Sequence, residues 1–99
     1  MTETVAYKII DAAEWREAVA GGVYAGSAVD LADGYIHLST ADQLAETAHK
    51  HYAGRENLVL LTVDLTALDT IVWEPSRGGA LFPHIYGLLP VTAVRDASP

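Results

Sequence analysis

The sequence predicts an α+β fold, a small β-sheet with two main helices packed on it. A nearly continuous apolar run at 58–63, LVLLTV, is typical of a central strand that is covered on both faces. Two segments with helical apolar spacing each begin at a capping residue and end at glycine. Short β-branched segments near both ends supply further strands. These elements favour helices packed on one sheet.

The first strand is predicted over residues 5–10, where β-branched and aromatic side chains predominate. Asp11 follows as a helix N-cap, with Glu14 placed to complete a capping box. The helix is expected to end at 21–22, a Gly-Gly pair that can supply a left-handed residue. Its buried stripe is expected to hold Ala12, Trp15, Val19 and the neighbouring Ala18.

The second helix is predicted from Thr40, its cap, to about Tyr52, with Gln43 completing a capping box and Gly54 ending the segment. Before it lie a turn-rich connection with a helical turn at 27–31 and a short strand over Tyr35, Ile36, His37 and Leu38. The helix is expected to bury Ala41, Leu44, Ala45, Ala48 and Tyr52.

The C-terminal part is predicted to hold a turn at 64–69, a strand at 71–73 and a last strand at 91–94. Between these strands, residues 73–87 read WEPSRGGALFPHIYG. Two prolines and a Gly-Gly pair interrupt this stretch, so we expect neither a regular helix nor a regular strand there.

Composition restricts the function. The chain has 99 residues, so one domain over 1–99 is expected. A net charge of −7 without a basic run disfavours nucleic acid as a partner. The absence of cysteine excludes thiolate chemistry, and no apolar segment is long enough for a membrane span. The N-terminus lacks the pattern of a secretory signal, and the cytoplasm is the expected location.

A first candidate site is GYIHLST at 34–40. Because side chains alternate along a strand, Ile36 and Leu38 would face the core, and the opposite face would carry Tyr35, His37 and Ser39. The start of the following helix suits an anionic or phosphate-bearing ligand. The alternative is that Ser39 and its neighbour only cap the helix and that His37 is solvated.

A second candidate site is the 73–87 stretch. We expect Glu74, Arg77, His84 and Tyr86 to face a cleft, with Trp73, Ile85 and Phe82 facing the core.

Arg77 would bind phosphate or carboxylate, and the glycines Gly78 and Gly79 would let backbone approach the ligand. The alternative is a surface ion pair between Glu74 and Arg77, worth about 0–1 kcal/mol. A metal site of His37, His84 and Glu74 fits a two-histidine, one-carboxylate pattern, but the spacing does not require it and we predict no metal.

Both stretches resemble a bacterial family, the domain-of-unknown-function family 952. The shared features span nearly the whole chain, and they are Trp15, Gly34 to Ser39, LLTVD, Trp73-Glu74 and Phe82 to Gly87. By remote similarity this family is grouped with the ADP-ribosyltransferase-like fold. The resemblance implies a split, strongly bent, mixed β-sheet with a cleft for NAD.

The resemblance also implies roles for individual residues. His37 and Ser39 would contact the nicotinamide ribose, and Glu74 would be the catalytic carboxylate of an NAD-using transferase or hydrolase. Many members have histidine on the first strand, where this chain has Lys8. That difference, with the lack of a clear nucleophile, supports the alternative of a non-catalytic domain that binds or senses a small anionic ligand. A further alternative is an acid–base enzyme with His37, His84 and Glu74 as catalytic residues, or a protein–protein module.

Overall fold

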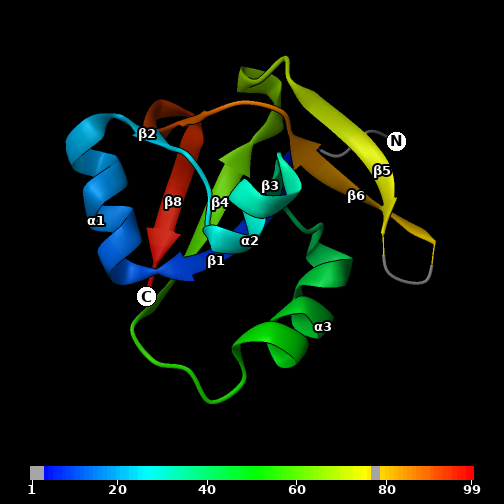
Figure 1. Ribbon diagram of the computed structural model, residues 1–99, viewed down its shortest axis with the longest axis horizontal. Helices are drawn as coiled ribbons and strands as arrows, with labels where there is room; N and C mark the ends of the chain where they lie inside the picture. Colours follow the sequence, from blue (N-terminus) through cyan, green and yellow to red (C-terminus); the bar gives the residue numbers. More distant parts are fainter. Residues whose placement is uncertain (1–3, 77–78) are drawn as a thin grey trace.

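The computed structural model describes residues 4–76 and 79–99 and has an α+β architecture (Figure 1). Arg77 and Gly78, two of the predicted ligand-binding residues, lie outside the described residues. The helices are α1 (Ala12–Gly21), α2 (Ala28–Asp33) and α3 (Ala41–Tyr52). None of the helices over the described ranges is long and apolar enough to span a membrane.

Within residues 4–76 and 79–99 the strands form three sheets in which every pairing is antiparallel, so the expectation of a mixed sheet is wrong. The first sheet has the order β1-β4-β8, from Val5–Asp11, Leu58–Asp64 and Val94–Ser98. A second pairs β2 (Val23–Tyr24) with β7 (Leu89–Pro90). The third has the order β3-β6-β5, from Ile36–His37, Ala80–Ile85 and Ile71–Ser76.

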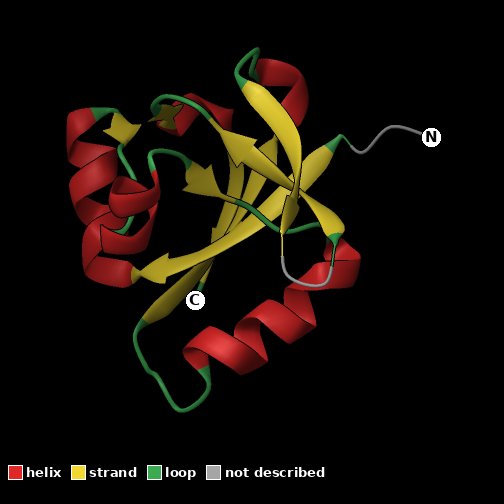
Figure 2. Ribbon diagram, turned by 45° about the vertical axis from the view of Figure 1, so that its right-hand side comes forward, coloured by secondary structure: helices red, strands yellow, loops and turns green. Residues whose placement is uncertain are grey.

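Over the described residues, one isolated bridge joins the first sheet to the third. Tyr7 on β1 exchanges backbone hydrogen bonds with Ser39, just beyond β3, at 2.7 and 2.9 Å. This bridge lies on the edge of β1 that does not pair with β4. The first and third sheets are therefore neighbours that are joined at one point and separate beyond it. Figure 2 shows α3 crossing beside these strands. The bridge places the end of β3 next to β1, which brings the predicted GYIHLST site against the first strand.

Several elements follow the sequence prediction. β1, α1, α3 and the central position of β4 are confirmed, and Gly22 ends α1 with a φ of 86°. Gln43 Oε1 accepts from the Thr40 amide at 3.0 Å, as predicted for the start of α3. The face of β4 that carries Val59, Leu61 and Val63 is buried, and its opposite face is only half-buried.

The described residues 73–76 and 80–85 of this stretch lie in two paired antiparallel strands, so the expectation of an irregular segment is wrong. β5 and β6 pair from Ile71↔Ile85 to Ser76↔Ala80, with Trp73 opposite Pro83. The Pro83 carbonyl accepts from the Leu38 amide on the β3 side at 3.0 Å. The N and the C=O of one residue point to the same side of a strand, so Pro83 removes no donor from the pairing with β5.

The buried faces of α1 and α3 also differ from the prediction. Val19 is exposed and Ala18 is buried, because α1 turns its Trp15–Ala18 side to the sheet. Ala41 and Ala45 are exposed, and the half-buried stripe of α3 runs through Leu44 and Ala48.

Asp11 makes no side-chain cap bond, because its carboxylate binds Arg55. The last strand begins at Val94, since Val91–Ala93 form a 3-10 turn. The two-residue pairing of β2 with β7 has no counterpart in the sequence prediction.

Candidate functional site

A cavity of about 510 Å³ lies between β1, α2, α3 and the end of β6. Its wall is partly apolar, with Ile9, Leu44 and Phe82, and partly polar. The polar residues that line it include Tyr7, Lys8, Ser27, Asp30, His37, Ser39, Thr47, Tyr52, Arg55 and His84. This size and mixture are typical of a small-molecule site.

The structure brings three of the predicted site residues together on this wall. His37, Ser39 and His84 all line the cavity, and the His37 and His84 rings meet edge to face at 5.3 Å. The short pairing of β3 with β6 sets this contact, because His37 and His84 are partners in the register. Ser39 is buried, and its Oγ lies 3.0 Å from Thr47 Oγ1 on α3.

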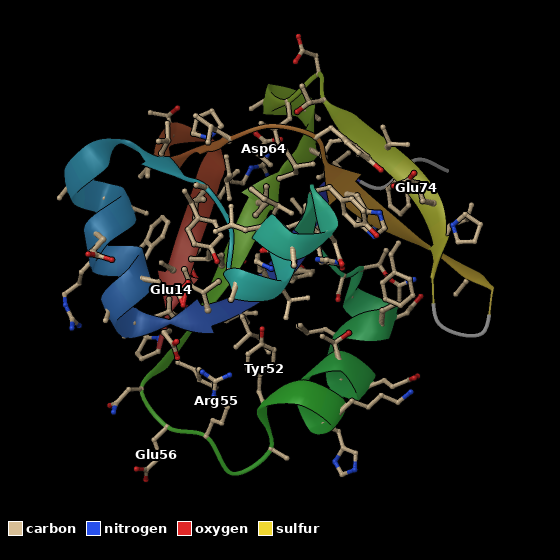
Figure 3. The ribbon with its side chains drawn as sticks, viewed as in Figure 1. Glu14, Tyr52, Arg55, Glu56, Asp64 and Glu74 are labelled. Atoms are coloured by element: carbon tan, nitrogen blue, oxygen red, sulfur yellow. The ribbon has the colours of Figure 1, made fainter. Side chains whose placement is uncertain are left out.

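Glu74, Tyr86 and Tyr35 lie outside the cavity wall. Glu74 and Tyr35 contact His84, and Tyr86 contacts both of them. Glu74 Oε1 lies 2.7 Å from His84 Nδ1, and the Tyr86 hydroxyl donates to both Glu74 oxygens at 2.8 and 3.0 Å. These hydrogen bonds lower the pKa of Glu74, that from His84 most. Figure 3 shows Glu74 on β5, on the other side of the molecule from Glu14, Tyr52 and Arg55.

Phe82 does not belong to the core-facing set in which the sequence placed it. Register pairs it with Glu74, so both lie on the face of the hairpin that carries His84, and Phe82 is buried against the cavity instead. Trp73 and Ile85 pack on the core as predicted. Gly79, by contrast, is exposed in the turn of the hairpin and does not line the cavity.

A buried charge cluster that the sequence did not predict forms one wall. Lys8 Nζ lies 2.9 Å from Asp30 Oδ2 and donates to the His37 carbonyl at 2.9 Å. Asp30 Oδ1 lies 2.6 Å from His37 Nδ1 and also accepts from the His37 amide at 3.1 Å. The other ring nitrogen of His37, Nε2, lies 3.0 Å from Asp33 Oδ2, so carboxylates occupy both nitrogens of this ring.

The pKa of Asp30 reflects opposing effects of burial and of its charged and hydrogen-bonding neighbours. Burial alone would raise it, but the hydrogen bond to His37, the Lys8 ammonium and the Ser27 amide outweigh burial and hold the pKa well below its ordinary value. A sequence signal for Lys8 existed, because it shares the strand face of Ala6 and Ile10, both buried. Asp30 follows Ser27 at the capping-box spacing, which predicts a helical turn but not the contact of Asp30 with Lys8.

Both cations of the cavity wall are paired with carboxylates. Lys8 is held by Asp30, and Arg55 NH2 lies 2.6 Å from Asp11 Oδ1 at the exposed rim. The wall also includes Glu14, whose pKa is raised by burial, so the described part of the wall carries three carboxylates against two cations. Among the residues that the structure describes, no group of three or more histidine and acidic side chains is arranged to hold a metal ion.

The fold and the site define a small α+β domain with a partly enclosed, mixed polar and apolar cavity. Residues 9–97 match the family described as "Protein of unknown function (DUF952)", and the chain belongs to this family. The resemblance stated from the sequence motifs is therefore confirmed at the level of the family.

Solved structures of protein CC0527 from Caulobacter crescentus are similar to this chain. Its crystal structure superposes with a TM-score of 0.93 at 52% identity, over 96% of this chain and 84% of that one. Its solution NMR structure gives a TM-score of 0.86 at 52% identity, over 97% and 84% of the two chains. No curated protein matches the sequence.

Proposed function

We propose that this protein binds a small molecule in the cavity between β1, α2, α3 and β6. The observation that carries the proposal is the meeting of polar side chains from separate elements on one cavity wall: His37 and Ser39 at β3, His84 from β6 and Thr47 from α3. Phe82 and Leu44 add apolar surface on which a ring or aliphatic group can pack.

The charges of the wall indicate which ligand suits it. Lys8 and Arg55 already pair with carboxylates, so a strongly anionic group would have to displace Asp30 or Asp11. A neutral or weakly charged, partly apolar ligand meets no such cost. An anionic ligand would instead bind near the rim, where Arg55 is half-exposed and lies 5.2 Å from the Tyr52 ring centre.

The proposal is tested by a substitution on α3 that fills the cavity. A fragment library is screened by ligand-observed NMR against the wild type, and hits are repeated with Leu44→Trp, which places an indole in the cavity. Ala45→Trp is the matched control, because Ala45 is the next residue of α3 and is exposed. Hits should be lost in Leu44→Trp and kept in Ala45→Trp. An empty screen, or hits that survive the Leu44 substitution, would contradict the proposal.

A second candidate is the NAD chemistry implied by the resemblance to the ADP-ribosyltransferase-like fold. The observation that favours it is that His37 and Ser39, the expected ribose contacts, share the cavity wall. The bond between ribose C1′ and the nicotinamide nitrogen would break, and water or an acceptor hydroxyl would attack C1′ and release a proton. Glu74 contacts His84 and not the cavity, so in this candidate it would act through that ring.

Incubation with NAD and chromatography for free nicotinamide tests this candidate. Release above the buffer rate, lost in Ser39→Ala and kept in the exposed control Ala45→Ser, would support it. A wild-type rate equal to buffer would contradict the NAD chemistry and leave the small-molecule proposal to its own test.

A further inference from the structure

The two histidines of the cavity differ in how their ring nitrogens are used. Carboxylates occupy both nitrogens of His37. His84 binds Glu74 through Nδ1 alone, and among residues 4–76 and 79–99 its Nε2 meets no hydrogen-bond partner. The His84 side chain is only 2% exposed and lines the cavity, so a partner for this nitrogen can reach it only from the cavity.

Glu74 determines which His84 nitrogen carries the proton. An ionised carboxylate can only accept, so Nδ1 must donate at the 2.7 Å contact. In the neutral ring, Nε2 is then the acceptor with an open lone pair. The low pKa of Glu74, caused first by this hydrogen bond and then by that from Tyr86, keeps the carboxylate ionised.

Neighbouring side chains also fix the orientation of the His84 ring. Tyr35 stacks on His84 with ring centres 4.2 Å apart and an interplanar angle of 25°, and Tyr86 fixes both oxygens of Glu74. Neither Tyr35 nor Glu74 lines the cavity, while His84 does. The Nδ1 edge and one ring face are therefore covered from outside, and the His37 ring packs at 5.3 Å. We infer that His84 meets the cavity with its remaining Nε2 edge.

A buried acceptor without a partner costs free energy, and such groups in folded proteins are normally paired. We propose that Nε2 of His84 is the acceptor at which the cavity receives a hydroxyl or amide N–H of its ligand, with Glu74 as the positioning residue. This inference rests on the proposed small-molecule function and adds the chemical class of the group that is recognised. A carboxylate or phosphate oxygen would meet a lone pair there and be disfavoured.

The first experiment reads the tautomer without any ligand. Two-bond ¹H–¹⁵N correlation spectra of the imidazoles are recorded above the ordinary histidine pKa of about 6.5, with His84 assigned by its loss in His84→Gln. The wild type should show Nδ1–H and an unprotonated Nε2. Glu74→Ala should shift His84 toward the Nε2–H tautomer that free imidazole prefers.

Two variants control this result. Tyr86→Phe keeps the carboxylate and should keep the tautomer. Glu56→Ala removes an exposed carboxylate on the loop after α3, far from Glu74, and should change nothing at His84 (Figure 3). An Nε2–H tautomer in the wild type, or one that Glu74→Ala leaves unchanged, would overturn the inference.

The second experiment uses benzamide and benzoate, which share a ring and differ in whether their polar group donates. Benzamide should move the ¹⁵N resonance of His84 Nε2 in the wild type and in Ala45→Trp, but not in Leu44→Trp. Benzoate should move it at least tenfold less at equal concentration. A resonance that responds equally to both, or to neither, would overturn the recognition of a donor. The tautomer experiment needs no ligand, and the proposed function is tested by the Leu44→Trp substitution. Failure of the inference and failure of the proposed function can therefore be distinguished.

Discussion

Lys8 on β1 and Asp30 on α2 form a buried ion pair of 2.9 Å, and their side chains are only 6% and 2% exposed. Asp30 also accepts from the backbone amides of Ser27 and His37, and the Lys8 ammonium donates to the His37 carbonyl. One carboxylate thereby holds together the start of α2, β3 and β1. The cluster positions His37 and closes one side of the cavity.

Removal of one partner of this pair should be strongly destabilising, because the other charge stays buried without compensation. We expect Asp30→Ala to lower the free energy of unfolding by about 3–5 kcal/mol. Asp33→Ala is the matched control, since Asp33 lies on the same helix and contacts the same histidine but is 46% exposed. It should cost about 0–1 kcal/mol. Urea denaturation measures both, and equal losses would contradict this account.

Low pH should lower the free energy of unfolding, because Asp30 becomes protonated. Its pKa in the folded chain lies below the ordinary value, so the folded state binds fewer protons than the unfolded state. The stabilisation is complete above the unfolded pKa of about 3.9 and is lost as pH falls toward the folded pKa.

Asp30→Asn should remove this part of the pH dependence. Glu14, whose pKa is raised by burial, contributes in the opposite direction and is unchanged in both proteins. Urea midpoints across the acid range compare the two, and parallel curves would show that Asp30 does not supply the effect.

Gly26 allows the backbone to approach Asp30 closely. Its φ is +118°, and a Cβ at this position would lie 2.8 Å from Asp30 Cβ. Gly26→Ala should destabilise the protein by about 1–3 kcal/mol, through backbone strain and displacement of Asp30.

Gly54→Ala separates these two causes. Gly54 also has a positive φ, of +80°, but a Cβ there would meet nothing within 4 Å. Thermal unfolding of both variants measures the difference, and a larger loss in Gly54→Ala would argue against a steric role for Gly26.

The ion pair of Arg55 with Asp11 should contribute little to stability despite its short distance of 2.6 Å. Both side chains are more than 40% exposed, at 47% and 41%, so water and salt screen the pair. Arg55→Ala should change the free energy of unfolding by less than about 1 kcal/mol. Urea denaturation at low and high salt checks this, and a loss comparable to that of Asp30→Ala would contradict the ranking.

Local patterns sufficed to predict several features of the fold and of the site. Alternation placed Ile36 and Leu38 in the core, and both are 1% exposed. It also placed His84 and Tyr86 on one face, where both contact Glu74. Alternation could not show that the proline-containing stretch pairs as a hairpin. Pro83 has no N–H, and the sequence does not show whether that side of its backbone faces β3 or β5.

The sequence by itself determined the class of fold, the two main helices, the central strand and the strand faces that carry His37 and His84. Those features depend on local periodicity and capping, which neighbouring residues specify. Only the tertiary structure decided that Lys8 meets Asp30, that Glu74 lies behind His84 and that Phe82 lines the cavity. These contacts depend on strand register and on the packing of distant segments, and a short polar side chain carries no local signal of the partner it will meet.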